Sequence, residues 1–239
     1  MSRPDGRSAD ELRSVRYEIG YLDWAEGSVM FEMGRTRVLC AATFEASVPR
    51  FLQGSGKGWV TGEYAMLPRS TLERTPREVN RGRPGGRTQE IQRLIGRTLR
   101  SIAKLDRLGE TTIIVDCDVL QADGGTRTAS ITGGYIALAL AVRALRERGV
   151  LDADVLQDSV AAVSAGMVEG EARLDLDYEE DAKADVDFNV VMTGSGRLVE
   201  VQGTAEGEPF SRADLDRILE LSEAGIKHLT AIQREAAGV

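Results

Sequence analysis

Histidine and cysteine are the scarcest reactive residues in this chain of 239 residues. The only histidine is His228, and the only cysteines, Cys40 and Cys117, lie inside apolar, strand-like runs. One histidine argues against a histidine pair, a Ser-His-Asp triad or a multi-histidine zinc centre. Two buried thiols argue against a disulfide framework and favour a cytoplasmic location. Any chemistry must therefore come from carboxylates, arginines, hydroxyls, backbone amides or a bound metal.

Long apolar runs are also missing. The first residues, MSRPDGRSADELRS, are charged and polar, so we expect no signal peptide, and no apolar run is long enough to suggest a membrane span. A composition of 42% hydrophobic and 28% charged residues is typical of a soluble globular protein. We expect one domain over residues 1–239, because a chain of this length can bury a large core without splitting.

Positive charge is scarce overall but concentrated in one region. The net charge is −8, yet residues 69–107 hold ten arginines and one lysine against four acidic residues, so this region carries +7 and the remainder −15. Six of the arginines lie in residues 68–87, among three prolines and three glycines, where no regular structure is expected. A long basic loop of this kind predicts a surface that binds a polyanion.

The stretch QADGGTRTAS at residues 121–130 is the centre of the pattern. A strand over residues 111–120 precedes it, and an Ala- and Leu-rich helix over residues 131–148 follows. Glycines permit close approach of the backbone, and the first amides of a helix lack intrahelical partners, so this stretch can hold an oxyanion. Thr126, Thr128 and Ser130 add hydroxyl donors, and Arg127 adds a charged fork. The alternative is an ordinary turn followed by a helix N-cap.

The remaining pattern mixes strands and helices without parallel βα repetition, which predicts an α+β fold. Strand pairs are expected at residues 28–46, with a turn near Gly34, and at residues 188–202, around Gly194-Ser195-Gly196. Further strands are expected at residues 58–67 and 159–167. A terminal helix should follow Ser211, whose spacing to Asp214 resembles a capping box, and continue to about Ala236.

Residues 88–104 form the clearest amphipathic helix, with an apolar stripe at Ile91, Leu94, Ile95, Leu99 and Ile102. Beside the stripe, Arg93, Arg97 and Arg100 recur at helical spacing without acidic partners four residues away. This ridge is either a solvated helix face or, given the basic loop before it, a set of phosphate contacts.

An acidic run at residues 170–187 contains two aspartates in special positions. Asp187 stands at the start of an expected strand, and Asp181 lies six residues earlier. A turn can bring the two carboxylates together, which would suit Mg²⁺ or Mn²⁺. Acidic surface loops that bind nothing are the competing interpretation.

With these segments in view, the sequence resembles the bacterial ribonuclease PH family almost from end to end. Distant similarity extends to polynucleotide phosphorylase and the ring subunits of the exosome. The stretches that carry the resemblance are RPDGR (3–7), GEYAMLPRST (62–71), GRTQEIQRLIGRTLR (86–100), CDVLQADGGTRTASITG (117–133), EEDAKADVDFNVVMT (179–193) and EVQGTAEGEPF (200–210).

The resemblance implies a ribosomal-protein-S5-domain-2-like fold and a homo-hexamer built as a trimer of dimers. It implies a phosphate-dependent 3′→5′ exoribonuclease that trims tRNA precursors and other RNA 3′ ends. Inorganic phosphate is the co-substrate, and nucleoside 5′-diphosphates are the products.

Site residues also follow from the resemblance, position by position. Arg87, Gly125, Thr126 and Arg127 would bind the attacking phosphate, and Asp181 and Asp187 would be the essential carboxylates that bind Mg²⁺ or Mn²⁺. The resemblance places Arg69, Arg74 and Arg77 in the loop used for ring contacts and RNA approach. It makes Arg93, Arg97 and Arg100 the ridge that faces RNA.

Two other functions remain open at this stage. A hydrolytic nuclease would use the same aspartates with water as the nucleophile, but it would leave the Gly125–Arg127 cradle and Arg87 unused. A ring subunit without activity would bind RNA only, although this chain keeps all four charged site residues, Arg87, Arg127, Asp181 and Asp187.

Overall fold

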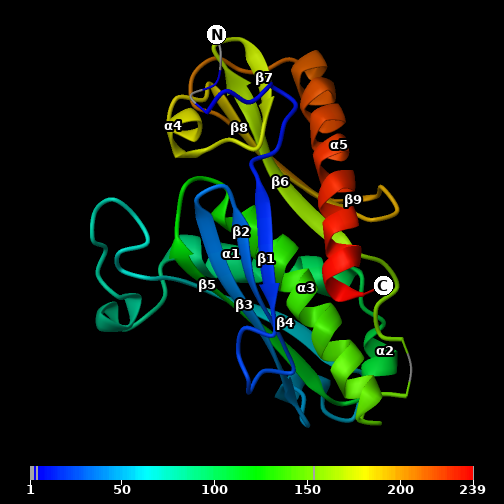
Figure 1. Cartoon of the computed structure of the whole chain (residues 1–239). Coiled ribbons are helices and arrows are strands. Elements are labelled where there is room, and N and C mark those ends of the chain that lie inside the picture. Colours follow the sequence, from blue (N-terminus) through cyan, green and yellow to red (C-terminus); the bar gives the residue numbers. More distant parts are fainter. Residues whose placement is uncertain (1–2, 4, 153, 239) are drawn as a thin grey trace.

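The computed structural model describes residue 3 and residues 5–152 and 154–238, and it contains two β-sheets with helices packed between and beside them (Figure 1). The first sheet has the strand order β1-β2-β3-β5-β4. Its neighbours pair antiparallel, except for β4 and β5, which are parallel. The strands are β1 Val15–Ile19, β2 Gly27–Met33, β3 Thr36–Glu45, β4 Trp59–Met66 and β5 Thr112–Gln121.

The second sheet is antiparallel, with the order β7-β6-β8-β9. Its strands are β6 Val160–Val168, β7 Glu171–Leu174, β8 Val186–Thr193 and β9 Leu198–Ala205. Because β7 covers only one end of β6, side chains complete the rest of that edge. The Thr132 hydroxyl accepts from the Ala162 amide at 3.1 Å, and Gln233 donates to the Val160 carbonyl at 2.9 Å. These side chains therefore supply hydrogen-bond partners for backbone groups of β6 that β7 does not pair.

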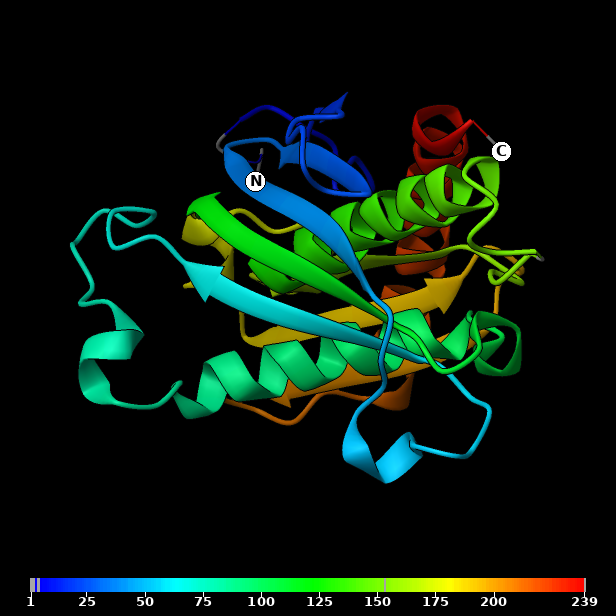
Figure 2. The ribbon, with the colours of Figure 1, turned by 90° about the horizontal axis from the view of Figure 1, so that it is seen from below.

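Two long helices, α1 Gly86–Ser101 and α3 Thr126–Glu147, run beside the strands of the first sheet, with the second sheet behind them (Figure 2). The predicted stripe of α1 is confirmed: all five apolar residues are buried in the main hydrophobic core. Each such side chain contributes roughly 1.5–3 kcal/mol relative to an exposed one. α3 contacts β2 and β3 on one side and β6 on the other, so it joins the two sheets.

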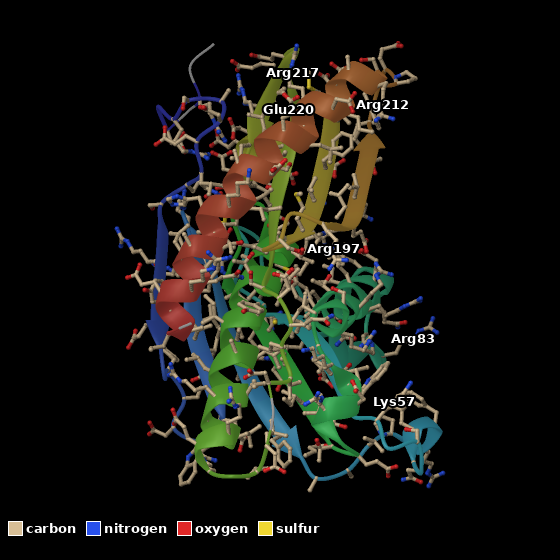
Figure 3. The ribbon with its side chains drawn as sticks, turned by 90° about the vertical axis from the view of Figure 1, so that its right-hand side faces the viewer. Lys57, Arg83, Arg197, Arg212, Arg217 and Glu220 are labelled. Carbon is tan, nitrogen blue, oxygen red and sulfur yellow. The ribbon has the colours of Figure 1, made fainter. Side chains whose placement is uncertain are left out.

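The C-terminal helix, α5 Arg212–Ala237, packs on the second sheet, and its predicted capping box between Ser211 and Asp214 is confirmed. Its outer side carries exposed charged residues, of which Arg212, Arg217 and Glu220 are labelled in Figure 3. The short elements are η1 Arg50–Leu52, η2 Glu78–Arg81, α2 Leu105–Leu108 and α4 Tyr178–Asp181.

The prediction of no regular structure over residues 68–87 is wrong in two places. The short helix η2 lies inside it, and α1 begins at Gly86 rather than at Thr88. The first residues of a helix need no intrahelical amide partners, so glycine at the boundary is tolerated. Similarly, α3 begins at Thr126 and not at Ile131. The other predicted strands, and the mixed α/β class, are confirmed.

One helix within the described ranges, α3, is long and apolar enough to cross a membrane by length and composition. However, 89% of its apolar window is buried inside the protein. Its apolar character is explained by its place between the sheets. Cys40 and Cys117 are buried free cysteines, as predicted, and His228 is exposed.

Candidate active site

The turn between β5 and α3 has a conformation that only glycine adopts easily. Gly124 and Gly125 have φ values of +74° and +63°, in the left-handed region. Gly125 is the N-cap of α3 and offers no side-chain cap, whereas α4 and α5 are each capped by a side chain. The amides at the start of α3 are therefore left for another acceptor, at the positive end of the helix dipole.

Two of the three hydroxyls in this stretch do not serve the role predicted for them. Thr128 donates to the Gly125 carbonyl at 2.9 Å and Ser130 to the Thr126 carbonyl at 2.8 Å. Thr126 shares a hydrogen bond of 2.9 Å with Tyr64 from β4. The prediction that all three hydroxyls add donors for an anion is wrong for Thr128 and Ser130, because helix carbonyls already accept from them. Thr126 can accept from Tyr64 and keep its own O–H for an anion. The backbone amides at the start of α3 also remain as donors for an anion.

Arg127 extends from the first turn of α3 into the space between α1 and the second sheet. Its Nη1 atom donates to Gln202 Oε1 on β9 at 2.7 Å and lies 3.4 Å from Glu90 Oε1 on α1. The side chain is only 14% exposed. A guanidinium anchored in this way presents its remaining donors in a fixed direction.

Arg87 is exposed in the first turn of α1, and its charge acts on Tyr64 as the charge of Arg127 does. Burial raises the pKa of Tyr64, while its bond to Thr126 and the charges of Arg87 and Arg127 act in the opposite direction. The structure thus brings together Arg87, Arg127 and the start of α3, which lie far apart in the sequence.

Two carboxylates approach the same place from the second sheet. Asp181 ends α4, and Asp187 is the second residue of β8. Loss of solvent around the carboxyl raises the pKa of Asp181, the like charge of Asp187 raises it further, and Arg87, Arg127 and Arg13 oppose this increase. Asp181 therefore lies close enough to Asp187 and to the three arginines for their charges to act on its carboxyl.

A glycine explains how α4 reaches the turn. A Cβ atom on Gly124 would lie 2.5 Å from the Leu176 carbonyl oxygen and 3.0 Å from the Tyr178 amide nitrogen. Only glycine allows the turn to lie against the segment that leads into α4. The bare backbone at Gly124 therefore sets the separation between the anion-binding turn and Asp181.

The predicted basic ridge on α1 is not a single surface. Arg93 is exposed, and Arg97 is exposed but paired with Glu200 on β9. Arg100 instead donates to the Val60 carbonyl at 2.7 Å and stacks over the Trp59 ring at 4.1 Å. Burial lowers the pKa of Arg100, and the charge of Arg97 adds to this effect. The prediction of three solvent-facing arginines is wrong for Arg100, which packs on the protein body.

The loop arginines Arg69, Arg74 and Arg77 are exposed on residues 67–85, which extend from the body as a long arm (Figure 1). Arg69 donates to the Leu72 carbonyl within the arm at 2.8 Å. The Ser70 carbonyl accepts from the Ala122 amide at 2.8 Å, so Arg69 lies at the base of the arm, beside the end of β5, and Arg74 and Arg77 lie farther along it.

Sequence reasoning missed several residues that build the site. Gln202 and Glu90 hold Arg127, Tyr64 holds Thr126, and Arg13 contacts the carbonyls of the turn. Their partners are 37 to 111 residues away in the sequence. The one available signal was the concentration of arginines near the N-terminus, at positions 3, 7 and 13, in an acidic chain.

Comparison with known proteins assigns the class. The model of the 3′ exoribonuclease family, domain 1, matches residues 11–144, and that of domain 2 matches residues 158–225. The chain belongs to the 3′ exoribonuclease family. It is 59% identical to Ribonuclease PH of Moorella thermoacetica, over all of this chain and 95% of that protein. It is 53% identical to Ribonuclease PH of Syntrophomonas wolfei, over the full length of both. The resemblance to bacterial ribonuclease PH is thereby confirmed.

Solved structures support the fold. Rice (Oryza sativa) Rrp46 superposes with a TM-score of 0.82 at 22% identity, covering 99% of this chain and 100% of that one. The Archaeoglobus fulgidus exosome with RNA bound to its active site contains a chain with a TM-score of 0.79 at 21% identity, covering 97% and 92%. The predicted mixed α/β fold is thus that of exosome subunits.

Proposed function

We propose that this chain is a phosphorolytic 3′→5′ exoribonuclease that trims the 3′ ends of tRNA precursors and other RNAs. The observation that carries the proposal is the convergence of Arg87, Arg127 and the uncapped start of α3 beside Asp181. This arrangement holds a free oxyanion next to a phosphodiester, which a hydrolytic nuclease does not need.

The reaction joins two anions. An oxygen of inorganic phosphate attacks the phosphorus of the terminal linkage, the bond to the 3′ oxygen of the preceding nucleotide breaks, and that oxygen takes a proton. The products are a nucleoside 5′-diphosphate and an RNA shorter by one nucleotide. Phosphate is already a competent nucleophile at neutral pH, so a histidine base is not required. Arg87, Arg127 and the helix amides reduce the repulsion between the anions and orient them.

Asp181 and Asp187 fit a hard divalent cation such as Mg²⁺ or Mn²⁺. Their oxygens are the ligands such ions prefer, and their mutual repulsion would be relieved by a cation. No group of three or more His, Cys, Asp or Glu side chains gathers for a metal within the described residues. Mg²⁺ typically keeps several waters or binds substrate phosphates, so two carboxylates suffice. When bound, the ion would neutralise charge that develops during displacement at phosphorus.

Assembly and location complete the proposal. The arm of residues 67–85 projects from the body (Figure 1), and its arginines Arg69, Arg74 and Arg77 are exposed, as expected of a segment that contacts another subunit or RNA. We infer a homo-hexamer built as a trimer of dimers, with the arm in its subunit contacts. A cytoplasmic location accords with the free cysteines.

The purified chain should release nucleoside diphosphates from a 3′-extended tRNA only when inorganic phosphate is present. With excess nucleoside diphosphate it should run in reverse and lengthen the RNA. Chromatography of the labelled products measures both reactions. Release of monophosphates without phosphate would establish a hydrolytic nuclease instead, and no release under either condition would establish a binding subunit.

The exposed arginines of α1 should contribute to RNA binding through phosphate contacts. A hollow of about 460 Å³ lies beside α1, and two arginines, Arg97 and Arg197, are among the residues that line it. Changing Arg93 and Arg97 to glutamine should weaken RNA binding and reduce its salt slope, by about 0.7 per lost contact on a single strand. Fluorescence anisotropy at several salt concentrations measures the slope.

The matched control is the double change of Arg212 and Arg217 to glutamine, because both are exposed on the outer side of α5 (Figure 3). This control removes the same charge and should leave the slope unchanged. If the two double variants have equal salt slopes, the arginines of α1 contribute only to the overall charge of the protein and do not contact RNA phosphates. Arg100 is left intact, since its contact with Trp59 is structural.

A further inference from the structure

The two halves of the site come from segments far apart in the chain. The anion-binding turn at residues 123–125 follows β5, and the segment at residues 175–181 follows β7 and includes α4. Phosphorolysis requires the two to be held within a fraction of an ångström of the productive geometry. A side chain from neither segment, Arg13, contacts both.

Arg13 grips Asp175 on one side. Its backbone amide and Nε donate to Asp175 Oδ2 at 2.8 and 3.0 Å, and its Nη2 donates to Oδ1 at 2.7 Å. Asp175 is fully buried, and Arg13 is 6% exposed. Burial alone would lower the pKa of Arg13, but the charge and hydrogen bond of Asp175 raise it above the ordinary value. The guanidinium therefore remains charged and fixed.

On its other side Arg13 holds the turn. Its Nη1 donates to the Asp123 carbonyl, and its Nη2 lies 3.5 Å from the Gly124 carbonyl oxygen. The buried Thr36 hydroxyl donates to the same Gly124 carbonyl at 2.7 Å and accepts from the Asp123 amide at 2.9 Å. In a trans peptide unit the carbonyl and the following amide point in opposite directions. Carbonyls held toward Arg13 and Thr36 therefore direct the amides of Gly124 and Gly125 to the opposite side.

Asp175 is in turn fixed to α4. It has a φ of +52°, uncommon for aspartate, and its amide donates to the Ser164 carbonyl at 2.7 Å. Arg3 donates to the Asp175 carbonyl at 2.9 Å and to Glu180 Oε2, inside α4, at 2.6 Å. Buried charges satisfied on all sides form a rigid unit. Asp181 follows directly on this unit.

We propose that Arg13 is a positioning residue. Held by Asp175 and acting together with Thr36, it fixes the position of the phosphate-binding amides relative to Asp181. The inference rests on the proposed phosphorolytic function and identifies which residues, without touching substrate, determine phosphate affinity. It also gives a role to part of the acidic run, since Asp175 lies in the interior and not on a solvated surface.

The test compares Thr36→Val with Thr36→Ser. Valine keeps the shape but removes the hydroxyl that orients the turn, whereas serine keeps the hydroxyl. Thr36→Val should raise the KM for phosphate about tenfold without changing the KM for RNA, because the turn loses the hydroxyl that bonds both the Asp123 amide and the Gly124 carbonyl. Thr36→Ser should stay within about twofold of wild type.

Thr98→Val is the matched control. Thr98 is fully buried on α1, and its hydroxyl has no hydrogen-bond partner among the described residues. This variant should keep the wild-type KM for phosphate. A purely structural role for Thr36 would instead lower kcat and the melting temperature without separating the two KM values.

Arg13→Lys provides a second variant if Thr36→Val does not fold. Lysine keeps the charge beside Asp175 but cannot reach both carbonyls with one planar fork. It should also raise the KM for phosphate at least tenfold. A wild-type KM for phosphate in either folded variant overturns the positioning role. Loss of phosphate dependence in the wild-type protein would overturn the proposed function itself, so the two failures are distinguishable.

Discussion

Changing Asp181 or Asp187 to asparagine should reduce kcat for phosphorolysis at least about a hundredfold. Each change keeps the side-chain shape but removes a charge that a divalent ion needs, and metal stabilisation of the transition state amounts to several kcal/mol. Product release from a 3′-extended tRNA at saturating Mg²⁺ and phosphate gives kcat. Near-normal turnover in either variant would remove that aspartate from the mechanism.

Glu179→Gln is the control, because Glu179 is exposed on α4 beside Asp181 and its change removes the same charge. This variant should retain activity. The two aspartate variants should also bind tRNA and remain folded. If they unfold instead, the carboxylates are structural anchors of α4 and β8.

The stability of the metal-free protein gives an independent check on the carboxylate pair. The pKa of Asp181 is raised, so folding disfavours its ionised form, and the wild-type protein gains stability as the pH falls through this pKa. Asparagine at position 181 remains neutral at every pH. The variant should therefore be at least as stable as wild type at pH 7, and the difference should disappear near pH 3. Thermal unfolding at both pH values measures it.

Local patterns were sufficient to predict most of the fold. The stripe of α1 and the capping box of α5 are fixed by residues a few positions apart, and the structure contains both. β1 was missed because it is a short edge strand with little buried surface, stabilised by pairing with β2. The four-residue helices α2 and α4 are too short to show a helical period. The position of β5 between β3 and β4 depends on pairing across the chain, which no local pattern reveals.

The candidate site could likewise be predicted only where its residues lie close together in the sequence. The glycine turn before α3 and the two aspartates were recognisable, because the chemistry of each lies in one short motif. The partners of Arg127 and the clamp of Arg13 were not, because Arg13 and Asp175 are 162 residues apart. Hydroxyls that seemed free in the sequence bond to helix carbonyls, and Arg100 packs on Trp59, since folding satisfies polar groups with the nearest partner.

Changing Arg127 to alanine should raise the KM for phosphate roughly 10- to 150-fold, the equivalent of about 1.5–3 kcal/mol for a hydrogen bond to a charged group. The KM for nucleoside diphosphate in the reverse reaction should rise as well, because its terminal phosphate takes the same place. Initial rates at varied phosphate concentrations measure the effect. An unchanged KM would show that Arg127 does not contribute to phosphate binding at all.

A change at Glu90, a partner of Arg127, distinguishes whether Arg127 binds phosphate or only links neighbouring elements. Glu90 is partly exposed and lies 3.4 Å from the Arg127 guanidinium, where it competes with a bound anion. If Arg127 binds phosphate, Glu90→Gln should leave the KM for phosphate unchanged or lower it, because the arginine loses a competing carboxylate while Gln202 still holds it. If Arg127 only ties the helices together, Glu90→Gln weakens one of its two links and should raise the KM, in the same direction as Arg127→Ala. The direction of the Glu90 effect therefore distinguishes a phosphate ligand from a structural contact.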